Sequence, residues 1–396
     1  DYTIKKMNED VLSKEPDTYY RMQWKERGKI VDKSEILHFT EEEKFIILAD
    51  RTPSSEAYID ELNRLVPDNM ILYREAAIQK DGENHNTVGC IQSDYDKLIG
   101  RMESEGISRI IYILGAKDKG NTEPDAAEDM KELQHIFYLS KSLLSIKQRN
   151  KIQIGIFTEY AYSISGQERV IPVHAAVLDF SRVLQTEVPN LVFHCMDTDR
   201  ETDRKAILHD FINGRGIRRT AYRRNKAYEE IIERAVNNRS NENTLPIKDG
   251  GIYIITGGTG GIGFLLTQSL ALKDNVTICI ISRHGLTEKH SEKYLELLER
   301  IKNSGSEIKF YKADVGSQNQ MESVIDTIRE LGKISGIIHC AGVAGDGYVL
   351  NKNVETFTEV LAPKVAGICL LDRLTRQDKP DFFVSCSSYV TLLPLP

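Results

Sequence analysis

The chain has 396 residues, with 52 basic against 59 acidic side chains and a formal net charge of -7. This acidic balance argues against a nucleic-acid-binding protein, and the 40% hydrophobic and 28% charged content is that of a globular soluble chain. Since the length exceeds that of a usual single core, we expect two domains.

Targeting and cysteine patterns favour a cytoplasmic protein. The six cysteines have no C-x-x-C spacing, and the nine histidines have no metal-ligand spacing, so we expect neither a disulfide framework nor a metal site. No signal peptide or bilayer-length apolar run is present, so we expect no membrane association. Because the first residue is Asp1 rather than Met, we expect the chain to come from a longer polypeptide.

Short β-branched apolar runs alternate with helical patterns, which is typical of βαβ units on a parallel sheet. In chain order, a first subdomain (1–236) has expected strands at 45–49, 70–73, 110–114, 152–157 and 191–195, with a helix at 173–187 before the last of them. The polar segment 237–251 is typical of a linker. A second subdomain (252–396) has expected strands at 252–255, 276–281, 308–311, 336–340 and 382–386. The predicted fold is therefore α/β, with two Rossmann-like subdomains on doubly wound parallel sheets.

The two halves resemble degenerate copies of one another. Segments 107–111 and 334–338 are alike at an offset of 227 residues, which sets 382–388 against 155–161. The first half then continues with a helix and a strand, whereas the second ends at Pro396. Because a sheet without its last crossover would expose an apolar face and an unpaired edge, we expect the second subdomain to be truncated here and to continue past Pro396.

The strongest motif is a glycine-rich turn between a strand and an amphipathic helix. Residues 252–255 lead into Thr256, Gly257, Gly258, Thr259, Gly260, Gly261, Ile262 and Gly263. Glycines let the backbone approach a pyrophosphate, and the helix N-terminus stabilises its charge. The alternative is a glycine turn without a ligand. The first half runs from 46–49 into 50–54 with no glycine, so only the second half is expected to bind a dinucleotide.

The end of the next strand favours NADP over NAD. An NAD site usually has an acidic residue there for the ribose 2′-OH, but this chain has Ser282, Arg283 and His284. A guanidinium suits a 2′-phosphate through paired charged hydrogen bonds. The alternative is an arginine that simply points into water.

Taken together, these motifs resemble the ketoreductase domains of modular polyketide synthases, a branch of the short-chain dehydrogenase/reductase superfamily. The matching segments are 256–263, Ser282-Arg283, Ala313-Asp314-Val315 and His339-Cys340-Ala341-Gly342. The resemblance implies that Asp314 and Val315 contact the adenine and that Cys340, Ala341 and Gly342 lie beside the nicotinamide ribose. In the first half, 172–189 looks like the family's helix after the fifth strand, which implies a cofactor-free structural subdomain.

The resemblance also implies a reaction. NADPH would reduce a 3-oxoacyl thioester, held on the phosphopantetheine arm of an acyl carrier protein, in a multienzyme for polyketide or antibiotic biosynthesis. It assigns a catalytic lysine to Lys364 and a carbonyl-binding serine to Ser388, with the catalytic Tyr and Asn expected beyond Pro396. The alternatives are a solvated helix lysine and a turn-forming serine. Asp346 is what remains of an L-D-D motif and predicts a D-hydroxyl product.

Other charged and polar features are given structural roles. The basic run 215–224 is interpreted as the solvated face of an edge strand rather than as a carrier-protein dock. Cys340 and Cys386 are interpreted as packing residues, and Asp50 and Glu159 as cap or turn residues. Two rival functions remain: a non-catalytic scaffold, and a nucleotide-sugar epimerase or reductase of the extended branch, which places its lysine four residues after the tyrosine.

Overall fold

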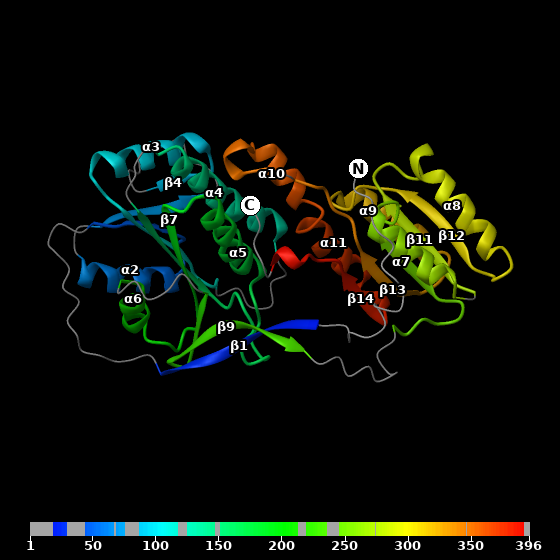
Figure 1. Cartoon of the computed structure of the whole chain (residues 1–396), viewed down its shortest axis with the longest axis horizontal. Helices are drawn as coiled ribbons and strands as arrows, with labels where there is room; N and C mark the ends of the chain where they lie inside the picture. The colour runs from blue at the N-terminus through cyan, green and yellow to red at the C-terminus, as the bar shows by residue number, and fades with distance from the viewer. Residues whose placement is uncertain are drawn as a thin grey trace, which may run out of the picture. The chain divides into compact units, whose positions relative to one another are not determined.

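The computed structural model describes residues 19–29, 44–66, 69–75, 87–117, 125–146, 151–212, 219–235, 245–273, 275–345 and 347–391 (Figure 1). They form two compact units. Unit 1 comprises Asp1–Gly89, Lys97–Asp118 and Lys147–Thr244, and unit 2 comprises Cys90–Asp96, Lys119–Ile146 and Leu245–Pro396. Most of the predicted linker, 237–244, lies outside the described residues, and its role stays a prediction.

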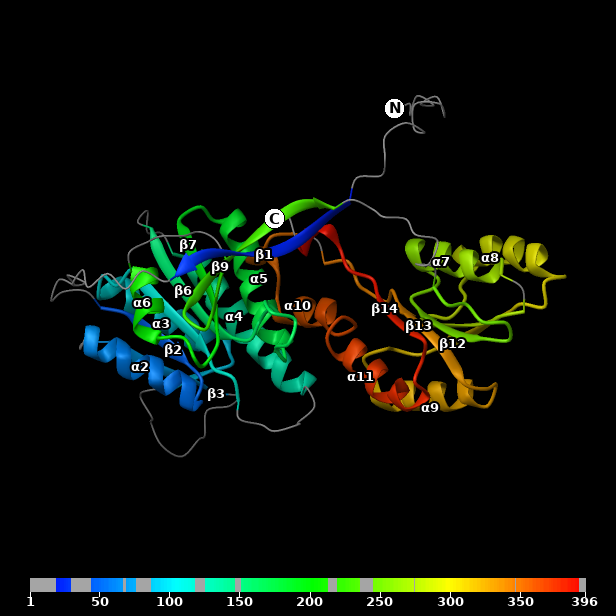
Figure 2. The ribbon, with the colours of Figure 1, turned by 90° about the horizontal axis from the view of Figure 1, so that it is seen from below.

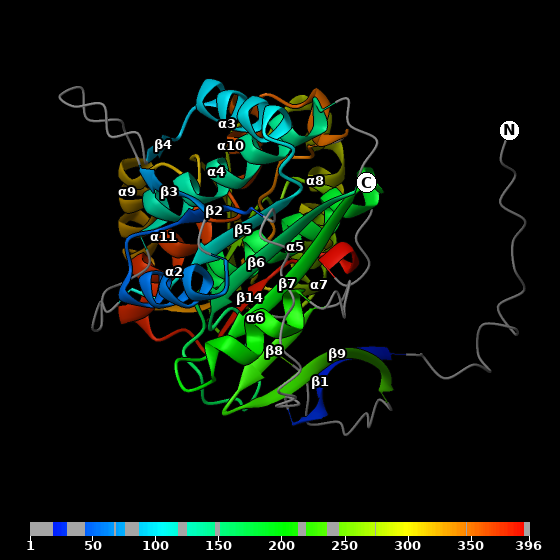
Figure 3. The ribbon, with the colours of Figure 1, turned by 90° about the vertical axis from the view of Figure 1, so that its left-hand side faces the viewer.

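Unit 1 is built on a nine-stranded sheet in the order β1-β9-β8-β7-β6-β5-β2-β3-β4. Neighbouring strands from β4 to β8 pair in parallel, whereas β9 pairs antiparallel with both β8 and β1. Figure 3 shows β1 and β9 side by side at one end of this sheet. Its strands are β1 (Tyr19–Lys29), β2 (Ile46–Ala49), β3 (Met70–Glu75), β4 (Thr87–Gly89), β5 (Arg109–Leu114), β6 (Ile152–Glu159), β7 (Leu191–Thr198), β8 (Thr220–Arg223) and β9 (Lys226–Ala235).

The helices of unit 1 are α2 (Pro53–Leu65), α5 (Pro172–Glu187) and α6 (Arg204–Ile212), and α3 (Gln92–Ser104) has residues in both units. Apolar side chains of α2 and α6, such as Leu62 and Phe211, are buried against Ile47 and Ile111 of the sheet. The predicted helix at 173–187 is confirmed as α5. The five predicted strands of the first half are confirmed as β2, β3, β5, β6 and β7, each within a few residues of its expected bounds.

Unit 2 has a five-stranded parallel sheet in the order β12-β11-β10-β13-β14. All five strands were predicted: β10 (Ile252–Thr256), β11 (Thr277–Ser282), β12 (Glu307–Lys312), β13 (Ile334–His339) and β14 (Phe382–Ser385). The helices are α4 (Ala126–Leu144), α7 (Gly261–Ala271), α8 (Glu288–Ile301), α9 (Gln318–Arg329), α10 (Val354–Leu361) and α11 (Ala366–Thr375), with 3-10 turns η1 (Val349–Asn351), η2 (Arg376–Asp378) and η3 (Tyr389–Thr391).

Helices cover both faces of the second sheet. Figure 2 shows α7 and α8 on one face and α9 and α11 on the other. Tyr294 and Leu297 of α8 belong to one apolar core, and Met321 of α9 and Leu371 of α11 belong to the other. The sheet is therefore doubly wound, which confirms the predicted α/β fold class. Strand order reverses at β10, so a ligand is expected at the carboxyl ends of β10, β11 and β13.

Helix α4 packs within unit 2 although it lies in the first half of the chain. The division into halves expected from the sequence therefore does not hold for this helix. The ring of Phe137 stacks on that of Phe357 in α10, with centroids 4.5 Å apart. Gln134 donates a hydrogen bond of 3.1 Å to Thr358. An apolar stripe facing another helix cannot be told from one facing its own sheet by periodicity alone.

The interpretation of the basic run 215–224 as a solvated edge strand is wrong for residues 219–223, whereas Arg224, in the turn after β8, is exposed. Strand β8 lies inside the sheet, between β7 and β9, and all four of its residues are buried. Arg219 and Arg223 are only 5% and 7% exposed, because each forms ion pairs with buried or partly buried carboxylates. Among the described strands the two edges of this sheet are instead β1 and β4, neither of which was predicted from the sequence. Residues 215–218 lie outside the described part of the chain.

Candidate active site at the carboxyl edge of the second sheet

Glycine is required at two positions of the turn between β10 and α7. Gly257 has a φ of 67°, and a Cβ there would lie 2.8 Å from the Cα of Ala341. A Cβ on Gly263 would lie 2.3 Å from the carbonyl oxygen of Gly257. The turn therefore packs backbone to backbone, both within itself and against Ala341, which follows β13.

The N-terminus of α7 is left open. Gly260 is its N-cap and supplies no side-chain hydrogen bond. A Cβ on Gly261 would meet no atom within 4 Å, and Ile262 is 65% exposed. The first N–H groups of a helix lack intrahelical partners and carry positive partial charge. The turn thus fits a pyrophosphate, for which these N–H groups would be the donors.

Helix α8 braces this turn through two residues that the sequence analysis missed. The Tyr294 hydroxyl donates a hydrogen bond of 2.7 Å to the carbonyl oxygen of Gly258, and burial raises the pKa of Tyr294 to about 12, so the phenol stays a donor. The Lys293 ammonium donates to the Thr259 carbonyl oxygen at 3.0 Å and lies 4.3 Å from the Phe264 ring centroid. A Lys-Tyr pair on an amphipathic helix carries no motif that could have revealed this role.

The residues assigned to the adenosine half lie at the neighbouring strand ends. The Ala313 N–H donates to the Ser282 carbonyl oxygen at 3.1 Å, which brings segment 313–315 beside the end of β11. The Asp314 carboxylate accepts the Gly316 N–H at 2.9 Å. The Arg283 side chain is 44% exposed, and its guanidinium lies 3.8 Å from the Glu359 carboxylate. Arg283 is therefore held loosely by one exposed partner.

A chain of hydrogen bonds through His339 joins three of the predicted motifs. His339 is 3% exposed, and its Nε2 lies 3.0 Å from the Pro363 carbonyl oxygen, which can only accept. Burial lowers the pKa of His339, so the ring is neutral near pH 7 and its Nδ1 accepts from the Thr256 hydroxyl at 2.7 Å. The Thr256 hydroxyl in turn accepts the Ala341 N–H at 3.2 Å.

Lys364 follows Pro363 and lies at this junction. Its Cε is 3.8 Å from the position that a Cβ on Gly342 would take. A Cβ on Gly367 would lie 2.9 Å from Val315, so the first turn of α11 packs closely here. The structure thus brings Lys364 to the turn 339–342 that the sequence analysis placed beside the nicotinamide.

Ser388 lies past the end of β14, at the same sheet edge. Strand β14 pairs with β13 up to Ser385 opposite His339, and Ser388 is exposed three residues later. Its hydroxyl accepts the Val390 N–H at 3.4 Å, a long bond that leaves the oxygen accessible. Asp346, the predicted stereochemical residue, lies outside the described residues.

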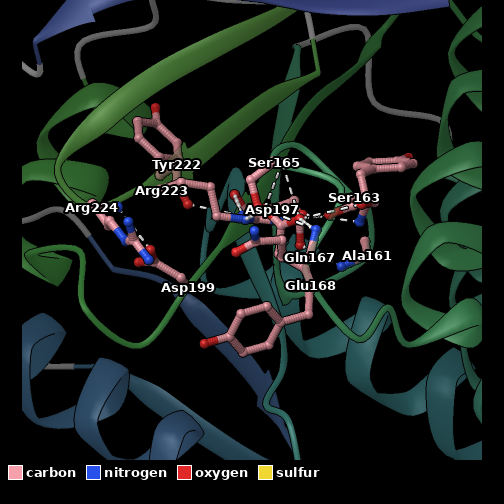
Figure 4. A network of polar contacts seen from close by, with 12 residues as sticks. Ala161, Ser163, Ser165, Gln167, Glu168, Asp197, Asp199, Tyr222, Arg223 and Arg224 are labelled. Atoms are coloured by element: carbon pink, nitrogen blue, oxygen red, sulfur yellow. Dashed lines mark hydrogen bonds and ion pairs between the residues drawn. The ribbon is translucent and has the colours of Figure 1, made fainter.

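In unit 1 the corresponding sheet edge is filled by a polar network of its own side chains (Figure 4). The Asp197 carboxylate accepts the Ala161 N–H at 2.7 Å and pairs with the Arg223 guanidinium at 2.6 Å. Arg223 also lies 3.5 Å from Glu168, whose carboxylate accepts the Ser165 N–H at 2.9 Å. The carboxylates of this network are paired with neighbouring N–H groups and with Arg223, so the network is a structural one, although the buried Arg223 Nε has no hydrogen-bond partner among the described residues.

Two family models match the chain. Residues 251–395 match the KR domain, and residues 76–214 match a model described as beta-ketoacyl synthase-like, N-terminal. Polyketide synthase PksN of Bacillus subtilis is 33% identical over 157 residues, which are 39% of this chain and 3% of that protein. A phenolphthiocerol/phthiocerol polyketide synthase of Mycobacterium tuberculosis is 24% identical over 303 residues, which are 75% of this chain and 16% of that protein. The chain thus spans a small part of these relatives.

Solved structures superpose on most of this chain. An N-terminal ketoreductase from a macrolactin assembly line superposes with a TM-score of 0.74 at 25% identity, covering 95% of this chain and 76% of that one. An A-type ketoreductase from a modular polyketide synthase superposes with a TM-score of 0.73 at 18% identity, covering 95% and 75% respectively. None of the described helices is long and apolar enough to cross a membrane.

Proposed function

Since this chain carries a ketoreductase domain of the polyketide synthase type, we propose that unit 2 binds NADPH and reduces the β-ketone of a 3-oxoacyl thioester to a hydroxyl. One observation supports this above the others: the Lys364 Cε lies 3.8 Å from the position that a Cβ on Gly342 would take. Hydrogen bonds from Pro363 through His339 to Thr256 join the segment before Lys364 to the start of the glycine loop. A scaffold domain without catalysis would have no need to keep the lysine there.

Each residue has a distinct role in the proposal. The open first turn of α7 binds the pyrophosphate, and Arg283 pairs with the 2′-phosphate. NADPH, when bound, would supply the hydride. The Ser388 hydroxyl donates a hydrogen bond to the ketone oxygen, and the Lys364 ammonium lowers the pKa of the tyrosine predicted beyond Pro396, which gives up the proton.

The substrate and its carrier are also part of the proposal. The names of relatives, such as the ketoreductase from a macrolactin assembly line, describe parts of multienzymes. We therefore propose that the acyl chain arrives on the phosphopantetheine arm of an acyl carrier protein in such an assembly. The D-hydroxyl product, predicted from Asp346, stays a prediction that chiral analysis of the product would decide.

The deciding experiment follows NADPH oxidation with a short 3-oxoacyl thioester, in a polypeptide that continues past Pro396. We expect Lys364→Ala to lower kcat by about 100-fold or more, the usual share of acid–base assistance. Lys333→Ala is the matched control, because Lys333 is an exposed lysine just before β13. Full activity of Lys364→Ala would contradict the mechanism, and turnover of a nucleotide sugar instead of the thioester would favour the epimerase alternative.

A further inference from the structure

Two cysteines face each other at the carboxyl ends of the last two strands of unit 2. Cys340 follows β13 and Cys386 follows β14, one step beyond the paired residues His339 and Ser385. The pairing continues there, because the Cys386 N–H donates to the His339 carbonyl oxygen at 2.9 Å. The two Sγ atoms are 3.0 Å apart, and both thiols are free. The sequence alone favours a packing role for each cysteine, whereas the structure brings the two sulfurs into contact.

The strand geometry is compatible with a bond between these sulfurs. Neighbouring strands lie about 4.8 Å apart, which falls inside the Cα separation of about 4.4–6.8 Å seen in disulfides. The sulfurs need to approach by about 1 Å to reach bonding distance. Side-chain rotation can supply this movement without a change of strand register.

We propose that Cys340 and Cys386 form a reversible thiol–disulfide pair that a peroxide oxidises. The Cys386 thiolate attacks one oxygen of the peroxide and the O–O bond breaks, giving a sulfenic acid and an alcohol or water. The Cys340 sulfur then attacks the Cys386 sulfur, the S–O bond breaks, and the leaving hydroxide takes the Cys340 proton as water. Two thiols lose two electrons and two protons, and the peroxide is reduced.

Exposure and protonation assign the two roles. Cys386 is exposed, so a peroxide can reach it, whereas Cys340 is half-buried. Burial, together with the hydrogen bond and charge of Cys386, raises the pKa of the Cys340 thiol to about 12. Cys386 therefore reacts first and Cys340 resolves the product.

The pair lies against the proposed cofactor site. A Cβ on Gly257 would lie 2.9 Å from the carbonyl carbon of Cys340, and Cys386 precedes Ser388 by two residues. A disulfide would couple the end of β13, and the glycine turn packed on it, to the serine segment. This consequence for NADPH binding rests on the proposed function, but formation of the disulfide does not.

The test treats the full chain with hydrogen peroxide and analyses intact mass and non-reduced peptides. We expect a loss of two hydrogen atoms, a peptide pair joined through Cys340 and Cys386, and full reversal by dithiothreitol. In Cys340→Ser we expect Cys386 to stop at a sulfenic acid that a dimedone probe traps. Cys369→Ser is the matched control, because Cys369 is also half-buried but lies on α11, and it should cross-link like the native chain.

Three outcomes would overturn the proposal: direct over-oxidation of Cys386 without a cross-link, a cross-link that joins other cysteines, or dimedone labelling that is equal in the native chain and in Cys340→Ser. Circular dichroism of each variant verifies that it is folded. Failure of the reduced chain to bind NADPH, while the cross-link still forms on oxidation, would contradict the proposed function and leave the redox pair standing, so the two failures are distinguishable.

Discussion

The two units differ at the turn between the first parallel strand and its helix, which is β2–α2 in unit 1 and β10–α7 in unit 2. Side chains form hydrogen bonds within this turn in unit 1, whereas backbone alone forms it in unit 2. In unit 1, Thr52 caps α2 by accepting the Ser55 N–H, and the Asp50 carboxylate accepts the Gly115 N–H at 2.9 Å. In unit 2, Gly260 caps α7 without a side-chain bond. The same strand–turn–helix is therefore closed by side chains in one unit and open in the other. Only the open one suits an anion.

A second comparison concerns the fourth and fifth parallel strands along the chain, which are β5 and β6 in unit 1 and β13 and β14 in unit 2. Strand pairing sets Gln153 opposite Arg109 in unit 1 and Phe382 opposite Gly336 in unit 2, so β6 and β14 correspond at an offset of 382 − 153 = 229. The offset of 227 that the sequence analysis carried forward is thus wrong by two residues on this strand. At the corrected offset, Ser388 corresponds to Glu159.

Glu159 is 1% exposed and is fully engaged by its surroundings. Its carboxylate accepts the Ala116 N–H at 2.9 Å and lies 3.6 Å from the Arg200 guanidinium. Ser54 also donates to it. Unit 1 has thus filled its crevice with charges that hold the fold, whereas unit 2 keeps an exposed hydroxyl there. Charge substitutions should therefore affect stability in unit 1 and ligand binding in unit 2.

The largest effect is expected from Arg223→Leu in unit 1. The substitution leaves the Asp197 carboxylate, 1% exposed, without its cation, and breaking a buried ion pair costs about 3–5 kcal/mol. The chain's one tryptophan, Trp24, lies in β1 with its ring centroid 5.2 Å from that of Tyr162. Its fluorescence in a urea titration therefore reports the unfolding of unit 1.

The control for this prediction is Arg224→Leu, because the Arg224 side chain is 81% exposed and its ion pair with Glu201 contributes about 0–1 kcal/mol. Equal shifts of the two midpoints would show that the buried network does not hold unit 1 together. That result would remove the contrast between the units.

In unit 2 we expect substitutions of two nearby glycines, Gly261 and Gly263, to have different effects on stability and on NADPH binding. Gly263→Ala places a Cβ against the Gly257 carbonyl oxygen, so we expect a loss of about 1–3 kcal/mol in stability together with loss of NADPH binding. Gly261→Ala meets no protein atom, so only the approach of the pyrophosphate is blocked. We expect its thermal unfolding to stay unchanged or rise while its NADPH affinity falls. Calorimetric titration and a melting curve measure both quantities.

The outcome that contradicts this prediction is Gly261→Ala with native NADPH affinity, because the open turn would then not be the phosphate site. A melting temperature of Gly261→Ala as low as that of Gly263→Ala would show that the open space at Gly261 is needed for folding rather than for a ligand.

Most of the strand ladder could be predicted from sequence, because buried parallel strands are continuous β-branched runs such as 252–255 and 110–114. Edge strand β1 could not, since its residues 19–29 carry several charged side chains and so resemble a loop. The role of His339 could not be predicted either, because its two partners, Thr256 and Pro363, are far apart in the chain. The contact between Cys340 and Cys386 depends on register, which sequence spacing does not determine.

A smaller effect is expected from Arg283→Asp, which exchanges a cation for an anion at the end of β11. Loss of one charge-assisted bond of about 1.5–3 kcal/mol predicts a 10–100-fold fall in the ratio of NADPH to NADH affinity. The matched control is Arg300→Asp on the exposed face of α8, which should leave the ratio unchanged. Glu359→Gln should raise NADPH affinity slightly, since it frees Arg283 from its ion pair. An unchanged ratio in Arg283→Asp would refute the NADP assignment.

The smallest effect is a pH dependence in unit 1. Burial opposes the charge on Glu168, but hydrogen bonds from the backbone N–H groups of Ser165 and Glu168 and from the Ser165 side chain, together with Arg223, outweigh it and lower the pKa of Glu168 from 4.5 to about 2. Because the folded pKa lies below the unfolded one, this carboxylate stabilises unit 1 fully above pH 4.5, and its contribution disappears as the pH falls towards 2.

We therefore expect Glu168→Gln to lower the stability of unit 1 by about 1–2 kcal/mol at pH 7, after allowance for solvent screening, and to approach the native chain as the pH falls below 4.5. Trp24 fluorescence in urea at a series of pH values measures this difference. Glu201→Gln is the control, because the Glu201 side chain is 68% exposed and should show no such convergence. A stability gap that persists undiminished below pH 4.5 would mean that Glu168 acts through packing, and the filled edge of unit 1 would then be held by shape rather than by charge.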